Sequence, residues 1–321
     1  MKKVLSTLLV VFLISILLVA CNPAPADSES DEPTIGFVYQ SANADAYHTV
    51  HYNECISYAK EIGINLIMLD PGGDVAKQIT QMEDLIEQKV DVLLLWPVDI
   101  NAVVPVVKKA YDAGIPVVTL VRLPEEAQPY VTAYVGEDQV NMGRILGQAI
   151  VDHFADSEKD IIKVVEIAVR SGSMVAQQRG DGFREAIEGT NIEIIESHSA
   201  ESSRETATQI MEGYLSKYGD DIDVVYCQGD SFGIGALDAI KDAGKVGQFV
   251  TTGIGRNIES NERMVLGELT YDVLTSPLAL ARAMMDAALV IATGGTVDPV
   301  VYVEAALVSL ENIDDFEVPT W

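Results

Sequence analysis

The sequence predicts an α/β protein made of two lobes, each a doubly wound parallel sheet covered by helices. Three observations support this fold class. A strand pattern followed by a helix pattern recurs at the spacing of a βαβ unit, about 30 residues. Residues 92–96 form an apolar run without alternation, as in a strand buried on both faces. The pattern begins again after residue 135, and 321 residues are enough for two such lobes.

The first lobe is expected to alternate strands with helices. Apolar residues at three- and four-residue steps indicate the helices, as at Val75, Ile79, Met82 and Ile86, and Gly63 ends the first of them. The expected strands are 35–39, 64–69, 92–96, 116–121 and 130–135, and the expected helices lie around 52–59, 75–86 and 101–113.

The second lobe repeats this order. Ala207, Ile210, Met211 and Tyr214 fall on one face of an expected helix, and Pro277 suits the first turn of a later one. The expected strands are 161–169, 192–197, 223–227 and 249–252, and the expected helices are 140–154, 175–188, 205–218 and 232–243. The tail breaks the repeat, with expected strands 269–274 and 300–307 and a helix over 277–292 that has room to return to the first lobe.

The N-terminal segment predicts export. A basic head, Met1-Lys2-Lys3, precedes an apolar run over 4–19, and Leu-Val-Ala-Cys follows at 18–21. This resembles the signal of a bacterial lipoprotein, which implies a signal peptide of residues 1–20 and acylation of the Cys21 thiol. An uncleaved membrane helix is the alternative, but the run is short for a bilayer of about 30 Å.

Residues 21–33 lack apolar side chains to bury, so we expect a disordered tether. A two-chain lipid anchor and this tether would hold the lobes on the outer side of the cytoplasmic membrane or in the periplasm. The formal net charge of -28 argues against a nucleic-acid partner, because nucleic-acid affinity depends on lysines and arginines that neutralise phosphates.

Two further cysteines, Cys55 and Cys227, lie on expected apolar faces. They could form a disulfide in an exported protein, but we interpret them as small buried hydrophobes. His48, His51 and Cys55 have a spacing that would suit zinc on one helix stripe. Because Cys55 belongs to the apolar face and no fourth ligand is near in sequence, we expect no metal.

Four short strings, in this order, carry a resemblance to a known family. They are AGIPVVT at 113–119, QRGDGF at 178–183, GD at 229–230 with GAL at 235–237, and GEL at 267–269 with proline at 277. With the export signal and the two lobes, they make the chain similar to the ribose/galactose-type periplasmic binding proteins, the type I solute receptors of ABC sugar importers. The resemblance runs from about Ile35 to Val308. It implies crossings between lobes near Gly136, Thr275 and Gly295, and a ligand enclosed by hinge closure.

The repeat and the resemblance together divide the chain. After the signal peptide and the tether, we expect an N-terminal lobe of 34–136 with 276–299, and a C-terminal lobe of 137–275 with 300–321. The family's pocket, carried over position by position, falls at strand ends and at the start of the first helix. The residues that the resemblance implies for ligand binding are Gln40, Tyr47, His48, Trp96, Asp99, Arg122, Gln177, Asp230, Arg256 and Thr275, beside Gly229 and Gly255.

Three of these residues have a structural alternative. Trp96 could belong to the core, but its place before a proline at a strand end favours stacking of its indole on a sugar. Asp99 could equally be the N-cap of the following helix. Asp230 could serve both as a cap and as a ligand-binding residue.

The chain departs from the family at positions that discriminate ligands. It has Arg122 without the preceding aspartate, Gln177 in place of an arginine, and Gly255 in place of an aspartate. A buried charge without a partner is costly, so Arg122 needs a counter-charge. Asp99 or Asp230 could supply it, or else a carboxylate or phosphate of the ligand would. We therefore expect a sugar or sugar-like polyol, with an acidic sugar derivative as the alternative.

The expected function is solute binding without chemistry. The chain would be a monomeric lipoprotein that delivers its ligand to the permease subunits of an ABC importer. A ligand-sensing receptor that docks a chemoreceptor or sensor kinase is the alternative. The sequence has no G-x-S-x-G, P-loop or H-E-x-x-H string, so we expect neither an enzyme nor a cofactor.

Overall fold

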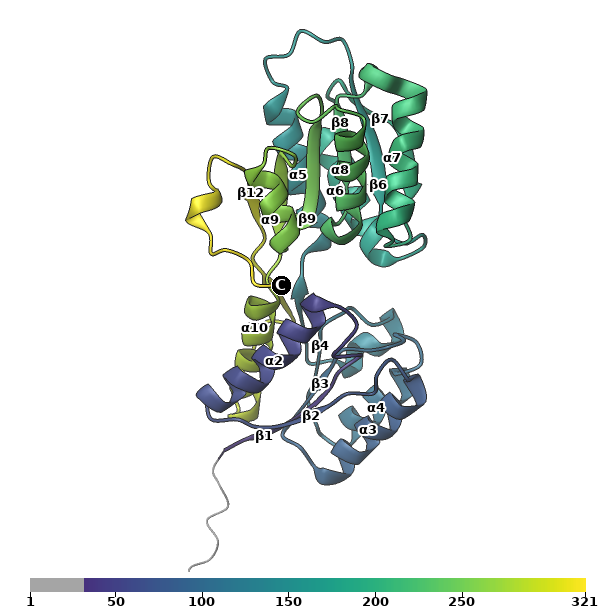
Figure 1. Cartoon of the computed structure of the whole chain (residues 1–321). Coiled ribbons are helices and arrows are strands. Elements are labelled where there is room, and N and C mark those ends of the chain that lie inside the picture. The colour runs from purple at the N-terminus through teal and green to yellow at the C-terminus, as the bar shows by residue number, and fades with distance from the viewer. Residues whose placement is uncertain (1–31) are drawn as a thin grey trace, which may run out of the picture.

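The computed structural model describes residues 32–321, and these form the two α/β lobes that the sequence predicts (Figure 1). The expected signal peptide of residues 1–20, the expected lipid anchor Cys21 and most of the expected tether lie outside the described residues. Within residues 32–321, every helix is too short or too polar to span a bilayer.

The first lobe is a six-stranded sheet between helices. Its strands are β1 (Thr34–Val38), β2 (Asn65–Leu69), β3 (Val92–Leu95), β4 (Val117–Thr119), β5 (Ala133–Glu137) and β11 (Val300–Val303). Its helices are α2 (Ala46–Glu61), α3 (Val75–Gln88), α4 (Val104–Asp112) and α10 (Pro277–Ala292), with a 3₁₀ turn, η1 (Glu125–Tyr130). The strands are parallel throughout, in the order β11-β5-β4-β3-β1-β2.

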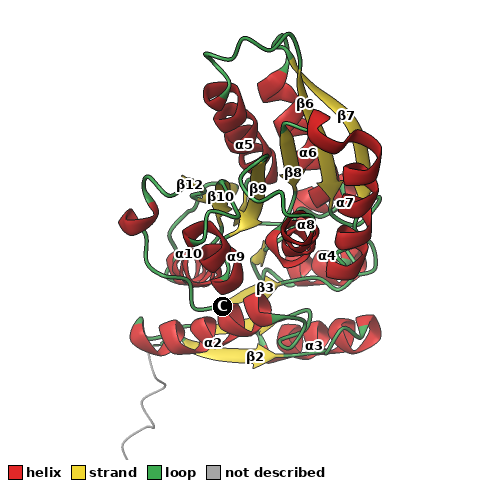
Figure 2. Cartoon of the chain, turned by 45° about the horizontal axis from the view of Figure 1, so that its top comes forward, coloured by secondary structure: helices red, strands yellow, loops and turns green. Residues whose placement is uncertain are grey.

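The two faces of this sheet have separate cores, because successive strand residues point to opposite sides. Leu94 of β3 packs with α2 and α10. Its neighbours Leu93 and Leu95 pack with α3 and α4. All four β3 residues are buried, which confirms the prediction of a strand covered on both faces. Figure 2 shows α2 and α3 along this lobe.

The second lobe has a second sheet of six strands. Its strands are β6 (Ile162–Ala168), β7 (Ile192–Ser199), β8 (Val224–Cys227), β9 (Val250–Gly255), β10 (Tyr271–Leu274) and β12 (Ala306–Val308). Its helices are α5 (Gln139–His153), α6 (Met174–Ile187), α7 (Arg204–Tyr218), α8 (Asp230–Asp242) and α9 (Ile258–Val265), with 3₁₀ turns η2 (Gly219–Asp221) and η3 (Ile313–Asp315). The order is β12-β10-β9-β8-β6-β7, and only the β10/β12 pair is antiparallel in this sheet of the described chain.

Two details of the sequence interpretation were wrong. The single strand expected over 300–307 is two strands: β11 pairs with β5 in the first sheet, and β12 pairs with β10 in the second. The third crossing therefore lies between Val303 and Ala306, not near Gly295, and Val300–Val303 belongs to the first lobe. Helix α9 was not predicted, because only Ser260 and Met264 are buried and no apolar stripe forms.

Helices α5 and α6 pack backbone to backbone. A Cβ added at Gly182 on α6 would lie 1.9 Å from the carbonyl oxygen of Val140 on α5. A Cβ at Gly143 on α5 would lie 2.0 Å from the carbonyl oxygen of Arg179 on α6. A side chain at either glycine would push the two helices apart, so both glycines are needed for this close packing.

The two described cysteines are free and buried, in the cores of different lobes. Cys55 lies on α2 and Cys227 on β8. The interpretation of both as small buried hydrophobes is confirmed.

Candidate functional site

A cavity of about 1030 Å³ lies between the lobes, at the carboxyl ends of β1, β3 and β4 on one side and of β8 and β9 on the other. Parallel sheets place their binding sites at this edge. Most of the residues predicted for ligand binding line this cavity, namely Gln40, Tyr47, His48, Trp96, Arg122, Asp230 and Thr275, as do Gly229 and Gly255.

An aromatic cluster forms the wall of the first lobe. Trp96, directly after β3, is half-buried and contacts the rings of Tyr39 and His51, with centroids 5.1 and 5.2 Å away. The His48 imidazole lies against Trp96 with centroids 4.7 Å apart and planes 32° apart. Burial lowers the pKa of His51 to about 3, so this ring is neutral at physiological pH. The indole packs in this cluster and also lines the cavity, and its stacking on a sugar stays a prediction.

His48 is held in a defined tautomer by its neighbours. Asp45, the N-cap of α2, accepts from the His48 backbone N–H at 2.9 Å and from Nδ1 at 2.7 Å. Nε2 is therefore left to accept from the amide of Gln40, which follows β1. Burial opposes ionisation of Asp45, but the hydrogen bonds from His48 outweigh it and lower the pKa of this carboxyl. These three residues place a fixed row of polar groups beside Trp96.

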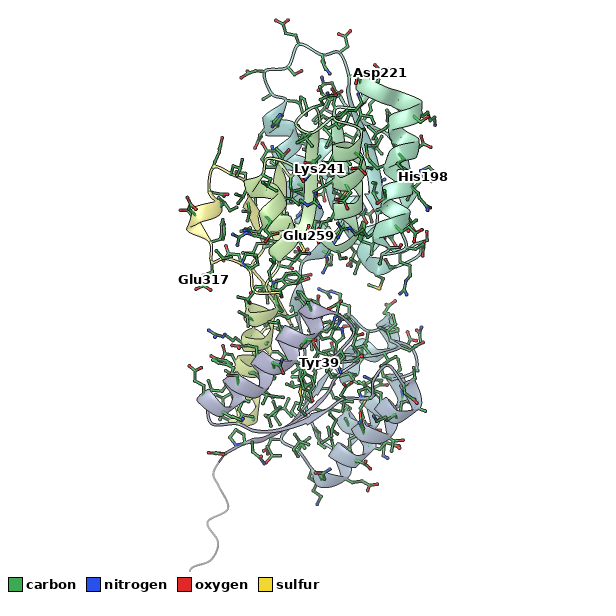
Figure 3. All side chains as sticks on the ribbon, viewed as in Figure 1. Tyr39, His198, Asp221, Lys241, Glu259 and Glu317 are labelled. Atoms are coloured by element: carbon green, nitrogen blue, oxygen red, sulfur yellow. The ribbon has the colours of Figure 1, made fainter. Side chains whose placement is uncertain are left out.

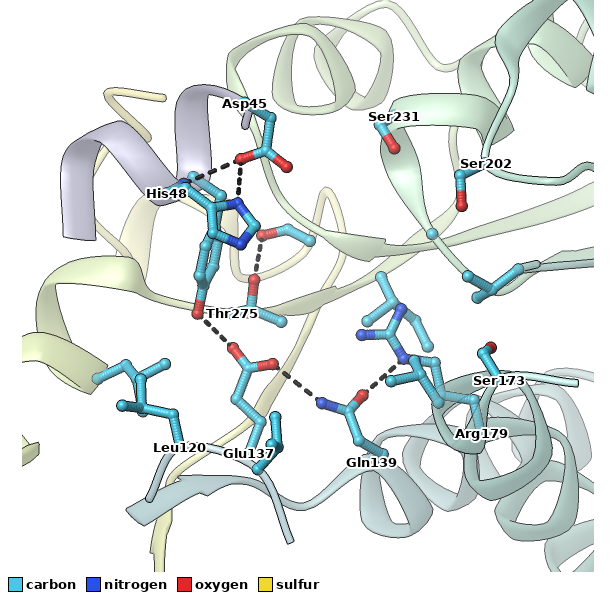
Figure 4. Close-up of a pocket in the computed structure, with 18 of the residues that line it drawn as sticks. Asp45, His48, Leu120, Glu137, Gln139, Ser173, Arg179, Ser202, Ser231 and Thr275 are labelled. Atoms are coloured by element: carbon cyan, nitrogen blue, oxygen red, sulfur yellow. Dashed lines mark hydrogen bonds and ion pairs between the residues drawn. The ribbon is translucent and has the colours of Figure 1, made fainter. Parts of the chain in front are cut away.

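A chain of hydrogen bonds crosses from one lobe to the other at the hinge. The Tyr47 hydroxyl on α2 donates to Glu137 Oε1 at 2.8 Å, and Gln139 Nε2 donates to Glu137 Oε2 at 3.1 Å. Arg179 on α6 donates from Nε to Gln139 Oε1 at 2.7 Å and from Nη1 to the Gln228 carbonyl. Burial and the Glu137 carboxylate raise the pKa of Tyr47, so its hydroxyl stays a donor. Figure 4 shows the Glu137–Gln139–Arg179 part of this chain.

Arg122 is half-buried at the end of β4 and lines the cavity. Its guanidinium lies over the Tyr134 ring, 5.1 Å from the centroid, and Nη2 donates to the Tyr302 hydroxyl at 3.1 Å. None of the ion pairs formed within residues 32–321 includes Arg122. Neither Asp99 nor Asp230 supplies the counter-charge that the sequence interpretation considered.

Asp230 is only 5% exposed where it begins α8. Its Oδ2 accepts from the Asn257 backbone N–H at 3.3 Å, and its Oδ1 has no hydrogen-bond partner among the described residues. A Cβ at Gly255, where φ is +150°, would lie 2.9 Å from Oδ2. The Asp230 carboxylate thus occupies the space that a side chain at position 255 would need. Gly229, not Asp230, is the N-cap of α8, so the capping part of the expected double role is wrong.

Thr275 lies at the second crossing between the lobes. Its hydroxyl donates to the Gly255 carbonyl at 3.2 Å, and the side chain is buried. This bond ties the hinge to the end of β9.

The remaining three predicted residues lie outside the cavity. Asp99 is exposed and accepts from the N–H groups of Asn101 and Ala102 at 2.8 and 2.9 Å. It stabilises the turn before α4, but the N-cap residue of α4 is Val103, so the N-cap alternative considered for Asp99 is wrong. Backbone donors favour its ionised form and lower its pKa.

Gln177 and Arg256 also point away from the cavity. Gln177 lies on a different face of α6 and lines a smaller cavity, while the next residue, Gln178, lines the main one. Successive helix residues are 100° apart, so a one-residue error exchanges the two faces. Arg256 is 2% exposed and donates to backbone carbonyls of residues 313 and 317 instead.

The structure adds cavity residues that the sequence analysis missed. Glu137 is the last residue of β5, Asp138 and Gln139 follow it at the first crossing, and this polar run at a strand end was a usable signal. Arg179 braces its own lobe through its bond to the Gln228 carbonyl, and it also lines the cavity. Trp321 lines it too, and no local pattern indicated this.

The possible zinc cluster of the first helix is not assembled as a ligand set. His51 Nδ1 lies 3.1 Å from the Tyr39 hydroxyl and 3.6 Å from Cys55 Sγ. Burial raises the pKa of the Cys55 thiol well above its usual value, which opposes thiolate formation. Within the described part of the chain, no three His, Cys, Asp or Glu residues are grouped to hold a metal.

Comparison with known proteins gives a consistent set of relatives. Residues 35–296 match the family model described as a periplasmic binding protein domain. A ribose import binding protein of Bacillus subtilis is 29% identical, with 90% of this chain and 92% of that protein aligned. A galactofuranose-binding protein of Escherichia coli is 33% identical, with 68% and 70% aligned.

A crystal structure of a Mycobacterium smegmatis protein in complex with β-D-fucofuranose is similar in three dimensions as well. Its TM-score is 0.75 and its sequence identity is 28%, over 88% of this chain and 93% of that chain. These relatives are named for binding and not for catalysis.

Proposed function

We propose, since this chain belongs to the family of periplasmic binding proteins, that it captures a sugar or sugar-like polyol between its two lobes. The observation that carries the proposal is the composition of the cavity. One wall presents the Trp96 indole beside the polar row of Asp45, His48 and Gln40, and the other presents Asp230 and the backbone around Gly255. An apolar ring surface with convergent hydrogen-bonding groups is what a polyhydroxylated ring requires.

The energetic argument rests on hydroxyl groups. A sugar hydroxyl left unpaired in a closed site costs about 1–3 kcal/mol, so a sugar site must offer several donors and acceptors. On one wall the Gln40 amide, the His48 imidazole and the Asp45 carboxylate offer such groups, and Asp230 lines the other wall. Relatives named for ribose and galactofuranose, and a neighbour in complex with β-D-fucofuranose, support the same ligand class.

Closure of the lobes would complete the site. The volume of about 1030 Å³ slightly exceeds the ~300–1,000 Å³ typical of ligand pockets, so there is room for the walls to approach. The three crossings at residues 137–139, 275–276 and 303–306 form a hinge with few covalent connections. The proposal includes a lipid anchor at Cys21, a monomeric state and delivery to the permease of an ABC importer, with docking to a sensor as the alternative.

The experiment is a ligand panel against the purified lobes, residues 32–321. D-ribose, D-galactose and myo-inositol, each at millimolar concentration, are tested for a rise in melting temperature, because a ligand that binds only the folded state stabilises it. We expect at least one to raise the melting temperature and to bind in a calorimetric titration. Absence of any effect across neutral sugars and polyols would contradict the proposal.

A second candidate ligand, an acidic sugar derivative, is favoured by Arg122. This guanidinium faces the cavity and makes no ion pair within residues 32–321, so a ligand carboxylate could supply the counter-charge. D-galacturonate and D-galactose are compared in wild type and Arg122→Gln. A larger fold loss for the acid than for the neutral sugar supports this candidate, and tight neutral-sugar binding without acid binding removes it.

A further inference from the structure

The segment that follows β12 places an aromatic side chain between the lobes. Trp321 lines the cavity, and its ring meets that of Tyr47 with centroids 5.1 Å apart and planes 88° apart. Its carbonyl oxygen accepts from the Ile258 backbone N–H at 2.8 Å. Tyr47 belongs to the first lobe and Ile258 to the second, so Trp321 contacts both. Figure 1 shows this end of the segment between the two lobes.

A buried arginine holds the segment in place. Arg256 donates from Nη1 to the Glu317 carbonyl at 2.7 Å and from Nη2 to the Ile313 carbonyl at 3.4 Å. Its guanidinium also lies over the Phe316 ring, 5.4 Å from the centroid. Because a buried cation without partners is costly, these contacts and the nearby Asp272 carboxylate offset the burial of the charge at 2% exposure. Figure 3 shows Glu317 on the yellow segment beside the second lobe.

The backbone of Arg256 directs its side chain to this task. Its φ of +54° is a left-handed conformation that is uncommon for a residue with a side chain. It follows Gly255 directly, at the end of β9 where ligand-binding side chains are expected. The side chain points to the segment instead of into the cavity. The left-handed backbone therefore orients the guanidinium toward the carbonyl groups of residues 313 and 317.

Apolar packing fixes the same segment upstream. Ile313 and Phe316 pack on a small core of the second lobe that includes Leu237, Leu269 and Val308. With Ile313 to Glu317 anchored on the second lobe, residues 318–321 extend from there to the cavity. The Tyr47 ring that Trp321 meets is itself oriented by its hydrogen bond to Glu137.

We propose that Trp321 is a ligand-contacting residue of the cavity, and that Arg256 is the positioning residue that holds it there. The inference rests on the proposed function. Both tryptophans of the chain, Trp96 and Trp321, then face one cavity. Two indoles offer apolar surface to the C–H faces of a ring, so the pair selects cyclic polyols and sugars over open-chain polyols of the same size.

The two tryptophans make the test direct. In Trp96→Phe, Trp321 is the single tryptophan, and acrylamide quenching of its fluorescence reports its exposure without any ligand. Arg256→Gln in this background should raise the quenching constant at least twofold, because the segment is released. Arg184→Gln, which removes an arginine that pairs with Glu166 elsewhere in the same lobe, is the control and should leave quenching unchanged. Equal quenching in all three variants overturns the role of Arg256.

Ligand contact is tested with D-galactose, myo-inositol and the open-chain polyol galactitol. Whichever cyclic probe binds wild type should at least halve the quenching of Trp321 in Trp96→Phe. Trp321→Ala should lose at least tenfold affinity for that probe and lose selectivity against galactitol. Binding that leaves Trp321 quenching unchanged, with Trp321→Ala within twofold of wild type, overturns the ligand contact. If no probe binds wild type, the proposed function fails and the ligand contact with it, while the quenching series still decides the role of Arg256.

Discussion

Single residues beneath the cavity carry an unusual electrostatic arrangement. Asp272 on β10 is fully buried, and neither carboxyl oxygen has a hydrogen-bond partner among the described residues. A Cβ at Gly253 would meet Oδ1 of both Asp230 and Asp272, at 2.2 and 3.5 Å, so the two carboxyl groups approach the same point. Burial raises the pKa of both, and the Asp230 charge raises that of Asp272 further.

This pair predicts a stability that falls as pH rises. Above the ordinary aspartate value of 3.8 and up to the raised pKa, the folded state holds more protons than the unfolded state, so the free energy of unfolding decreases over that interval. Asp272→Asn removes the carboxyl group that must ionise in the folded state. Its free energy of unfolding should exceed that of wild type by on the order of 1 kcal/mol at pH 7, with no difference near pH 4. Urea unfolding across pH measures this.

The exposed Asp298→Asn is the matched control, and its curve should follow that of wild type. If the free energy of unfolding depends on pH in the same way in Asp272→Asn and in wild type, the buried pair does not destabilise the fold at higher pH.

Trp96 gives the residue-scale prediction for binding. Removing an aromatic group that stacks on a ligand costs about 2 kcal/mol or more, so Trp96→Ala should weaken sugar binding about 30-fold or more in a calorimetric titration. Trp96→Phe keeps a ring and should lose less. An affinity of Trp96→Ala within a factor of two of wild type would place the ligand elsewhere.

Residue positions were predictable where a strand end fixes them. Trp96, Arg122 and Asp230 follow β3, β4 and β8, and all three line the cavity. Gln177 and Arg256 were not predictable in the same way. A helix face and a left-handed backbone angle, which decide where these two side chains point, leave no pattern in composition or periodicity.

At the scale of elements, apolar periodicity predicted most strands and helices within a few residues. Apolar periodicity failed where contacts between distant segments determine which sheet a strand joins or whether a helix forms. No turn residue separates β11 from β12, and nothing local shows that the chain changes sheets there. Helix α9 buries too little to produce a periodic signal.

The α5/α6 contact gives a prediction at this scale. Gly182→Ala should destabilise the second lobe by about 1–3 kcal/mol, because its Cβ would collide with the backbone of α5. Gly213→Ala is the control: it is exposed within α7 with open space around it, and alanine should stabilise the helix by up to about 1 kcal/mol. Chemical unfolding measures both, and an unchanged free energy in Gly182→Ala would mean that the helices can separate without cost.

For the whole molecule, the repeated strand-helix order was enough to predict two lobes, and the family resemblance implied the crossings between them. The position of the third crossing and the return of Trp321 to the cavity were not predictable. Both depend on which distant surface a segment packs against, and the segment's own residues do not encode that surface.

The lipid anchor is tested on the full chain. Cys21→Ala should move the protein from the membrane fraction to the soluble fraction, since the thiol that would be acylated is lost. Its sugar affinity should equal that of wild type, because residues 32–321 hold the cavity. Retention on membranes, or a loss of affinity, would contradict the proposed anchor and tether.

The central claim is that a small polar ligand draws the two lobes together, and small-angle X-ray scattering tests it most directly. The radius of gyration of residues 32–321 is compared without ligand and with a saturating concentration of the sugar that calorimetry identifies. The account predicts a smaller radius with ligand, because the cavity between the lobes closes. Calorimetric binding with an unchanged radius of gyration would contradict it.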